Sequence, residues 1–261
     1  MPSAFPATNS KIADMIGRYV LAALVVGLLA GAVLTVLQVW RLSPLIATAE
    51  IFEKADDAKN VPTGASSSAV PACKEAMPGM KMCPDNGTPE WEPAPGLPRI
   101  GFTGVASLLA GGGFSAILAG LSLLLNVPIT RANGWVWGLS GFFAVHLATG
   151  FGLAPEIPGM PVADLLARQI WWVGTITATS VAIYCFAIRT ENWAKAIGVA
   201  FLFAPHLIGA PIAPEGETSV PPALAAEFAA NALASAAIFW LVMGVLLGRF
   251  LPSIAERFET S

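Results

Sequence analysis

Six apolar runs, each close to the roughly 20 residues that a helix needs to cross a bilayer, constrain the fold more than any other feature of this chain. They cover residues 19–40, 102–125, 134–153, 170–188, 195–212 and 229–250. Only 12% of the residues are charged. The sequence therefore predicts an all-α, polytopic membrane helix bundle with six transmembrane helices. Because Pro205 and Pro211 interrupt one run, five helices are the alternative.

Positively charged residues near short loops predict the orientation of the bundle. They are Lys11, Arg18, Arg131, Arg189, Lys195, Arg249 and Arg257. All of these fall on one side of a six-helix arrangement, so we expect both termini in the cytoplasm of a bacterium, with the chain in its inner membrane. The expected segments are a cytoplasmic N-terminus (1–18), a first helix (19–40), a flexible acidic extracytoplasmic loop (41–101), a membrane bundle (102–250) and a cytoplasmic C-terminus (251–261).

Pairs of glycines spaced four residues apart predict close helix contacts. They are Gly27 and Gly31, Gly134 and Gly138, and Gly244 and Gly248. Small residues let helix backbones approach one another in lipid, where no hydrophobic effect drives them together. These residues favour a compact bundle and carry no chemistry.

The long loop contains a stretch rich in sulfur. Its members are Cys73, Met77, Met80, Met82 and Cys83. Two cysteines in an oxidising compartment commonly form a disulfide. Thiolate and thioether groups also favour soft ions such as Cu(I). A disulfide and a soft-metal site therefore both remain open.

The chain has two histidines, His146 and His206, and they lie in similar phrases. Each phrase begins near the end of an apolar run and closes with Ala-Pro-Glu, at Glu156 and Glu215. The similarity predicts that helices 3–4 and 5–6 form a parallel repeat about an axis along the membrane normal. A chance match between phrases rich in Ala, Pro and Gly is the alternative.

These phrases also suggest a path for a divalent metal ion. Neutral imidazole is a common metal ligand, and an ionisable group inside a membrane segment suggests a functional site. The expected ligands are His146, His206, Glu156, Asp164, Glu215 and Glu227. An ion from outside would meet carboxylates first and imidazoles deeper. Alternatively, each histidine hydrogen-bonds a neighbouring helix, while Asp164 and Glu227 cap helix N-termini.

Common catalytic signatures are absent from the sequence. It contains no phosphate-binding Gly-x-x-x-x-Gly-Lys-Ser/Thr loop, no nucleophile elbow, no His-Glu-x-x-His pair and no dinucleotide-binding fingerprint. We therefore expect no enzymatic activity and no permanently bound cofactor. We expect the lipid bilayer, and no nucleic acid, as a partner.

Several short sequence segments resemble those of the CbtA family of probable cobalt transporter subunits. These segments cover residues 153–160, 163–165, 167–169, 171–172, 205–211 and 222–228. The resemblance implies cobalt uptake for cobalamin synthesis, five membrane segments and a small single-helix partner with a histidine-rich end. It also implies motif positions of unstated role at Glu156, Asp164, Arg168, Gln169, His206 and Glu227.

Together these features predict a transport subunit that moves Co²⁺ inward. The sulfur-rich stretch replaces a histidine-bearing loop that would suit cobalt or nickel better, so copper is a competing ion. A non-transport accessory or scaffold subunit of a larger membrane complex is a further alternative.

Overall fold

The structure, a computed structural model, describes residues 6–60, 74–77, 80–82, 93–94, 96–216 and 218–259. Side chains are described for residues 16–56, 93–94, 96–216 and 218–253. The elements are α1 (Pro6–Leu37), η1 (Gln38–Leu42), α2 (Ser43–Asn60), β1 (Lys74–Met77), β2 (Met80–Met82), α3 (Leu97–Leu124), α4 (Gly134–Phe142), η2 (Phe143–Leu147), α5 (Ala148–Gly150), α6 (Leu165–Ala187), α7 (Asn192–Ile208) and α8 (Pro222–Glu259). The fold is the predicted helix bundle, and η1 and η2 are single π-helical turns within longer helices.

Among the described residues, four helical segments are long and apolar enough to cross a membrane. They are Ile16–Asp56, Leu97–Leu124, Leu165–Ala187 and Pro222–Ser253. Two shorter helical segments lie where the third and fifth transmembrane helices were expected. One is α4–η2–α5, with nine, five and three residues in turn, and the other is α7, with 17 residues. At 1.5 Å per residue, each is only about 25 Å long.

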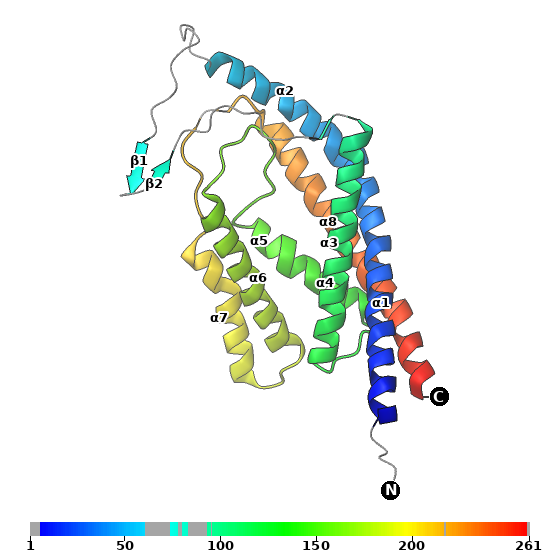
Figure 1. Cartoon of the computed structure of the whole chain (residues 1–261). Coiled ribbons are helices and arrows are strands. Elements are labelled where there is room, and N and C mark those ends of the chain that lie inside the picture. Colours follow the sequence, from blue (N-terminus) through cyan, green and yellow to red (C-terminus); the bar gives the residue numbers. More distant parts are fainter. Residues whose placement is uncertain are drawn as a thin grey trace.

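The helices form two groups. In the first group, α1 packs on α3 and α8, and α4 packs on α8. In the second group, α6 and α7 lie side by side, and α6 joins the first group through η2 and α5 (Figure 1). The α1 and α8 ends nearest the chain termini lie at the same end of the bundle (Figure 1).

Glycine contacts explain the tight packing of the first group. A Cβ atom at Gly27 would lie 2.3 Å from the carbonyl oxygen of Gly111, so α1 and α3 touch backbone to backbone. A Cβ atom at Gly138 would lie 2.3 Å from the carbonyl oxygen of Trp240, which brings α4 equally close to α8. The close contacts predicted from the glycine spacing are thus confirmed.

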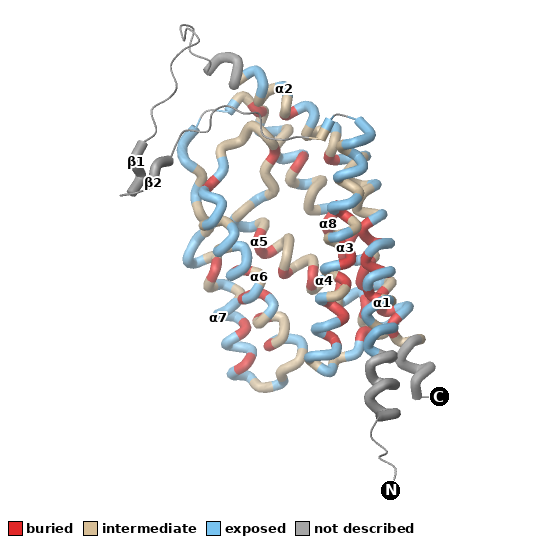
Figure 2. The backbone as a smooth tube through the Cα atoms, in the orientation of Figure 1, coloured by how far each residue is buried: buried red, intermediate tan, exposed pale blue. Residues whose placement is uncertain are grey.

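The largest buried cluster lies between α1, α3 and α8. Its members are Ala23, Val26, Ala30, Leu118, Ala119, Ile129, Phe239, Trp240, Met243, Leu247 and Leu251. Figure 2 shows this concentration of buried residues along α1, α3, α4 and α8, whereas much of α6 and α7 is exposed. The first group therefore forms the densely packed part of the bundle, and the α6–α7 pair contacts it through η2 and α5.

The first helix differs from the sequence expectation. We expected a helix over 19–40 followed by a loop from residue 41, but the helix continues through η1 and α2 to Asn60. The acidic residues of α2 suggested a loop, yet its apolar residues recur at helical spacing and pack against the loops after α5 and α7. This second cluster contains Leu42, Ala49, Ile157, Val220 and Phe228. Burial of this face explains why the segment is helical.

The expected repeat units differ in their packing. In the first expected unit, the segment α4–η2–α5 contacts the helix that follows it, because η2 and α5 lie against α6. In the second expected unit, the two described helices pack on different neighbours: α7 packs on α6, and α8 packs on α1 and α4. The parallel repeat therefore stays a prediction from the sequence.

The sulfur-rich stretch is described only in part. Strands β1 and β2 pair antiparallel, with Lys74 opposite Met82 and Met77 opposite Met80. Cys73 and Cys83 lie outside the described residues. The disulfide and the soft-metal site both stay predictions.

Candidate functional site

A cavity of about 650 Å³ lies between the ends of the two short helices and α6. It is lined by Phe143, Ala148, Phe151, Gly152, Trp171, Leu202, Phe203, His206 and Ala210. The walls are largely aromatic, and His206 is the one readily ionisable residue in the lining. We call this space the His206 cavity.

The local sequence explains why α7 ends at this cavity. Gly209 has a φ of +89°, a conformation that L side chains rarely adopt, and it follows the last residue of the helix. Pro205 has no N–H group, so the carbonyl of Phe201 lacks its usual intrahelical donor. The last turns of α7 therefore carry backbone carbonyls without a full set of intrahelical hydrogen bonds.

Close packing brings the ends of both short helices to α6. A Cβ atom at Gly152, just after α5, would lie 2.4 Å from the Trp171 ring and 2.9 Å from the Cβ atom of Ala210, just after α7. Only glycine leaves room for this three-way contact. The carboxyl ends of α5 and α7 thus meet at one cavity, and helix carboxyl ends carry partial negative charge that favours cations.

The His206 ring lies between two aromatic rings in this cavity. Its centroid is 6.2 Å from that of Phe151 and 6.1 Å from that of Trp171, with interplanar angles of 79° and 70°. The Trp171 indole N–H donates to the Pro205 carbonyl at 3.2 Å and so fixes α6 to α7 beside the histidine. No described group hydrogen-bonds the His206 imidazole, so its nitrogens are available to a ligand.

The surroundings of His146 are different. It lies in η2, 6.3 Å from the Phe142 ring, and its Nδ1 accepts a hydrogen bond from the Trp240 indole at 3.1 Å. Indole N–H is only a donor, so Nδ1 must supply its lone pair to Trp240. A neutral imidazole with that arrangement carries its proton on Nε2. While this bond persists, His146 has no free nitrogen lone pair for a metal.

The two histidines therefore do not share a set of neighbours. His206 lines the cavity against α6, whereas His146 faces the buried Trp240 of α8. This geometry favours the structural interpretation of His146, a hydrogen bond to a neighbouring helix. It leaves His206 as the histidine available for metal binding.

Glu156 and Arg168 form an ion pair with an N–O distance of 2.8 Å. Both side chains are largely buried, and Arg168 lies in the first turn of α6 while Glu156 lies in the preceding loop. This pair gives Arg168 a contact that the sequence did not predict: it holds the loop after α5 against α6.

Asp164 behaves as a helix cap. It is exposed, and its side chain accepts a hydrogen bond from the backbone N–H of Ala167 at 2.9 Å at the start of α6. Such a contact satisfies one of the free N–H groups at a helix start. The alternative interpretation of Asp164 as a cap thus describes its position in this structure.

The remaining expected ligands are exposed. Glu215 and Glu227 lie on the surface, and the Glu227 backbone carbonyl accepts from the Asn231 side chain at 2.8 Å. Gln169, a motif position of unstated role, is also exposed. The part of the chain that the structure describes contains no group of three or more His, Cys, Asp or Glu residues that could hold a metal ion. The expected ligands are thus distributed over separate positions.

Helix α2 holds the two loops that follow the short helices. Asp56 accepts hydrogen bonds from the backbone N–H and the hydroxyl of Ser219, which lies in the loop after α7. The Thr218 hydroxyl donates to the Gly159 carbonyl at 2.7 Å and joins the two loops directly. These contacts fix the loops beyond the cavity.

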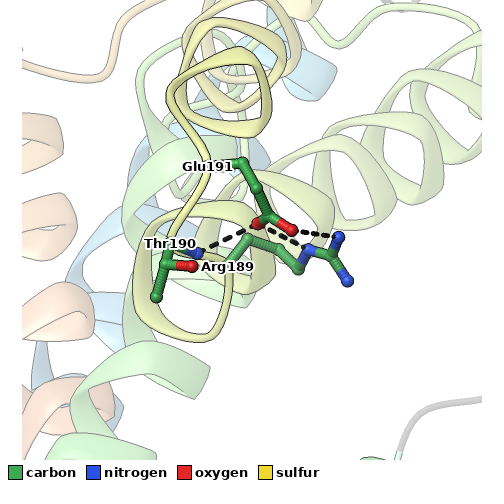
Figure 3. Close-up of polar contacts among 3 residues, drawn as sticks. All are labelled: Arg189, Thr190 and Glu191. Atoms are coloured by element: carbon green, nitrogen blue, oxygen red, sulfur yellow. Dashed lines mark hydrogen bonds and ion pairs between the residues drawn. The ribbon is translucent and has the colours of Figure 1, made fainter.

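A charged turn closes the opposite end of the α6–α7 pair. Figure 3 shows Arg189 paired with Glu191 at 2.7 Å, and the Thr190 backbone N–H donating to the same carboxylate at 3.1 Å. The Glu191 carboxyl has a pKa below its usual range, because backbone N–H groups, first its own, and the Arg189 guanidinium stabilise the charged form. Arg189 also lies 5.8 Å from the Trp193 ring centroid.

The sequence did not predict the aromatic walls of the cavity. Phe151, Trp171 and Phe203 come from three different segments, and only their tertiary arrangement brings them to His206. A local signal did exist, since Phe203 and His206 are three residues apart and share one face of α7. Pro205 beside His206 was a second signal, because a proline near a helix end leaves a carbonyl unpaired.

The fold, with four described helices long and apolar enough to cross a membrane, defines a polytopic helical membrane protein with a cavity beside its short helices. Residues 16–252 match the family model described as "Probable cobalt transporter subunit (CbtA)". The chain belongs to this family, and the resemblance noted in its sequence is confirmed. No curated protein and no solved structure matches the chain.

Proposed function

We propose that this chain is the subunit of a divalent metal uptake system that carries the metal, foremost Co²⁺, inward across the bacterial inner membrane to supply cobalamin synthesis. Membership of the family of probable cobalt transporter subunits supports metal transport in general. The observation that carries the proposal is the position of His206, an imidazole with no hydrogen-bond partner among the described groups, at the carboxyl ends of two short helices.

The chemistry of this position suits a cation. The carbonyl groups at the ends of α5 and α7 contribute negative potential, and imidazole is a ligand for divalent transition metals. The charge distribution in the sequence supports an outward-facing position for the cavity end of α7. The membrane potential favours cation movement inward by about 2.3 kcal/mol per elementary charge per 100 mV.

A partner subunit is part of the proposal. The family description calls its members subunits, and the described part of this chain lacks a group of three metal ligands. A small single-helix membrane protein with a histidine-rich end would be a metal-binding partner for the chain. We propose no catalytic role for the chain.

Cobalt accumulation tests the proposal. Cells without other cobalt importers should accumulate cobalt when they express this chain with its partner, and the His146→Ala/His206→Ala double variant should abolish the gain. Wild-type accumulation by the double variant at equal membrane abundance would contradict the proposal. Parallel measurements with nickel and copper identify the metal.

The scaffold alternative has one observation in its favour, the dispersed positions of the expected ligands. In that case, cells expressing the chain would not accumulate more metal than cells without it, and the double variant would give the same metal content as the wild type. The copper alternative requires the sulfur-rich stretch, so replacing Cys73 and Cys83 with Ser would reduce copper accumulation and leave cobalt accumulation unchanged.

A further inference from the structure

We infer that the His206 cavity takes its metal as a chelate with a planar organic ligand, bound to His206 through one open position on the metal. This inference rests on the proposed function, since it specifies the form in which the transported metal occupies the cavity. The cavity's size, its number of metal ligands and its aromatic walls support it.

The size of the cavity suits an organic ligand. Sites for small organic molecules and cofactors typically enclose about 300–1,000 Å³. The His206 cavity has a volume of about 650 Å³. A bare ion with metal–nitrogen bonds of about 2.0–2.1 Å needs only a small space among its ligands. An isolated ion bound to His206 would therefore leave most of the cavity unfilled.

The number of ligands suits a metal that arrives already coordinated. Divalent metals take about four to six donor atoms in protein sites. Among the lining residues, His206 is the one imidazole, and the lining includes no carboxylate and no thiol. A chelated metal brings most of its donors with it and needs a single axial nitrogen. One imidazole is sufficient for that purpose.

The walls suit a planar conjugated ligand. Phe143, Phe151, Trp171 and Phe203 provide aromatic surface around the histidine. The centroids of the Phe151 and Trp171 rings lie 6.2 and 6.1 Å from that of the His206 ring, so a planar ligand bound to the imidazole would have aromatic surface within reach.

The charge of the metal also favours binding as a chelate over binding as a bare ion. Moving a bare divalent ion into an apolar cavity is costly unless several polar groups replace its water. An anionic chelating ligand neutralises much of the metal's charge and presents an apolar surface. Phe151 and Phe203 remain 78% and 55% exposed, so these two walls are accessible to a ligand.

The test uses the full chain in lipid nanodiscs and compares planar cobalt chelates with the bare ion. The probes are bis(dimethylglyoximato)cobalt, cobalt protoporphyrin IX and cobalt chloride. Binding is followed by the change in visible absorption that accompanies axial ligation of cobalt by an imidazole. At least one chelate should bind with a Kd at least about tenfold below that of bare Co²⁺, a difference of about 1.4 kcal/mol.

Three variants test whether the chelate binds specifically in the His206 cavity. His206→Ala should abolish the absorption change and weaken chelate binding by at least about tenfold. Phe203→Ala should weaken chelate binding while leaving the affinity for bare Co²⁺ unchanged, because an ion contacts the imidazole and not the aromatic wall. Leu109→Ala, at a position 70% exposed on α3 and away from the cavity, is the control and should match the wild type.

Two results would overturn the inference. One is a bare-ion affinity at His206 equal to or above that of both chelates. The other is chelate binding that His206→Ala does not change, which would mean adsorption to an apolar surface. Cobalt accumulation in cells shows whether failure of the inference also contradicts the proposed function. If His206-dependent accumulation persists without chelate binding, the inference is wrong and the transport proposal stands.

Discussion

The indole N–H of Trp240 donates a hydrogen bond to Nδ1 of His146 across 3.1 Å, from the buried centre of α8 to the π-helical turn η2. Trp240 is only 2% exposed, and its ring also packs against Phe114 at a centroid distance of 4.9 Å. The bond links the first helix group to the segment that ends at the cavity. It favours a structural role for His146.

A double-mutant cycle measures this bond. Trp240→Phe and His146→Leu should each lower the free energy of unfolding, and the two changes should be coupled by about 0.5–1.5 kcal/mol, the usual net value of a hydrogen bond. The measurement is unfolding in mixed micelles. Fully additive effects would mean that the two side chains do not stabilise one another.

Gly138 tests the close contact of α4 and α8. Gly138→Ala would place a methyl group 2.3 Å from the Trp240 carbonyl oxygen, so the free energy of unfolding should fall by about 1–3 kcal/mol. Gly113→Ala is the matched control, because its added Cβ would meet no described atom within 4 Å beyond the nearby backbone of its own helix. That variant should keep or slightly raise stability, since alanine favours helices by about 1 kcal/mol over glycine. Equal melting temperatures for both variants would contradict the packing.

These contacts also show how far the sequence determines the fold. Apolar runs and glycine spacing predicted the helix bundle and its close contacts, because both depend on local pattern and on the length that a bilayer demands. The helical continuation through α2 was missed. Its apolar residues recur at helical spacing, but the loop residues Ile157 and Val220 that bury them are brought there only by the tertiary structure.

The candidate site could be predicted only in part. His206 was identified from its position in an apolar run, and the structure places it in a cavity. The family resemblance assigned only His206 to a motif, but the sequence did not show the physical difference between the two histidines, which is a contact of His146 with Trp240, 94 residues away. Nor could it predict the pairing of Glu156 with Arg168, which depends on how a proline-rich loop folds back on α6.

Arg168 should stabilise the loop after α5. Arg168→Ala leaves the largely buried Glu156 carboxylate without its ion pair, so the free energy of unfolding should fall by about 1–3 kcal/mol. Adding Glu156→Gln should recover part of that loss, since an uncharged amide costs less to bury. The exposed neighbour Gln169 provides the control, and Gln169→Ala should be neutral. No recovery in the double variant would indicate that the ion pair is not the source of the loss.

Thiol labelling tests the predicted disulfide between Cys73 and Cys83. An impermeant maleimide added to intact spheroplasts should label neither cysteine until a reductant is present. Cys185 is buried in α6 and should remain unlabelled in both conditions. Labelling of Cys73 or Cys83 without reductant would favour free thiols and the soft-metal alternative.

The most direct test of the account compares the two histidines singly in a cobalt accumulation assay. Cells without other cobalt importers would express wild type, His206→Ala or His146→Ala with the partner subunit, normalised to the amount of each protein in the membrane. We expect His206→Ala to fall to the level of cells carrying an empty vector, and His146→Ala to retain measurable accumulation because its role is structural. Accumulation by His206→Ala equal to that of the wild type would contradict the account.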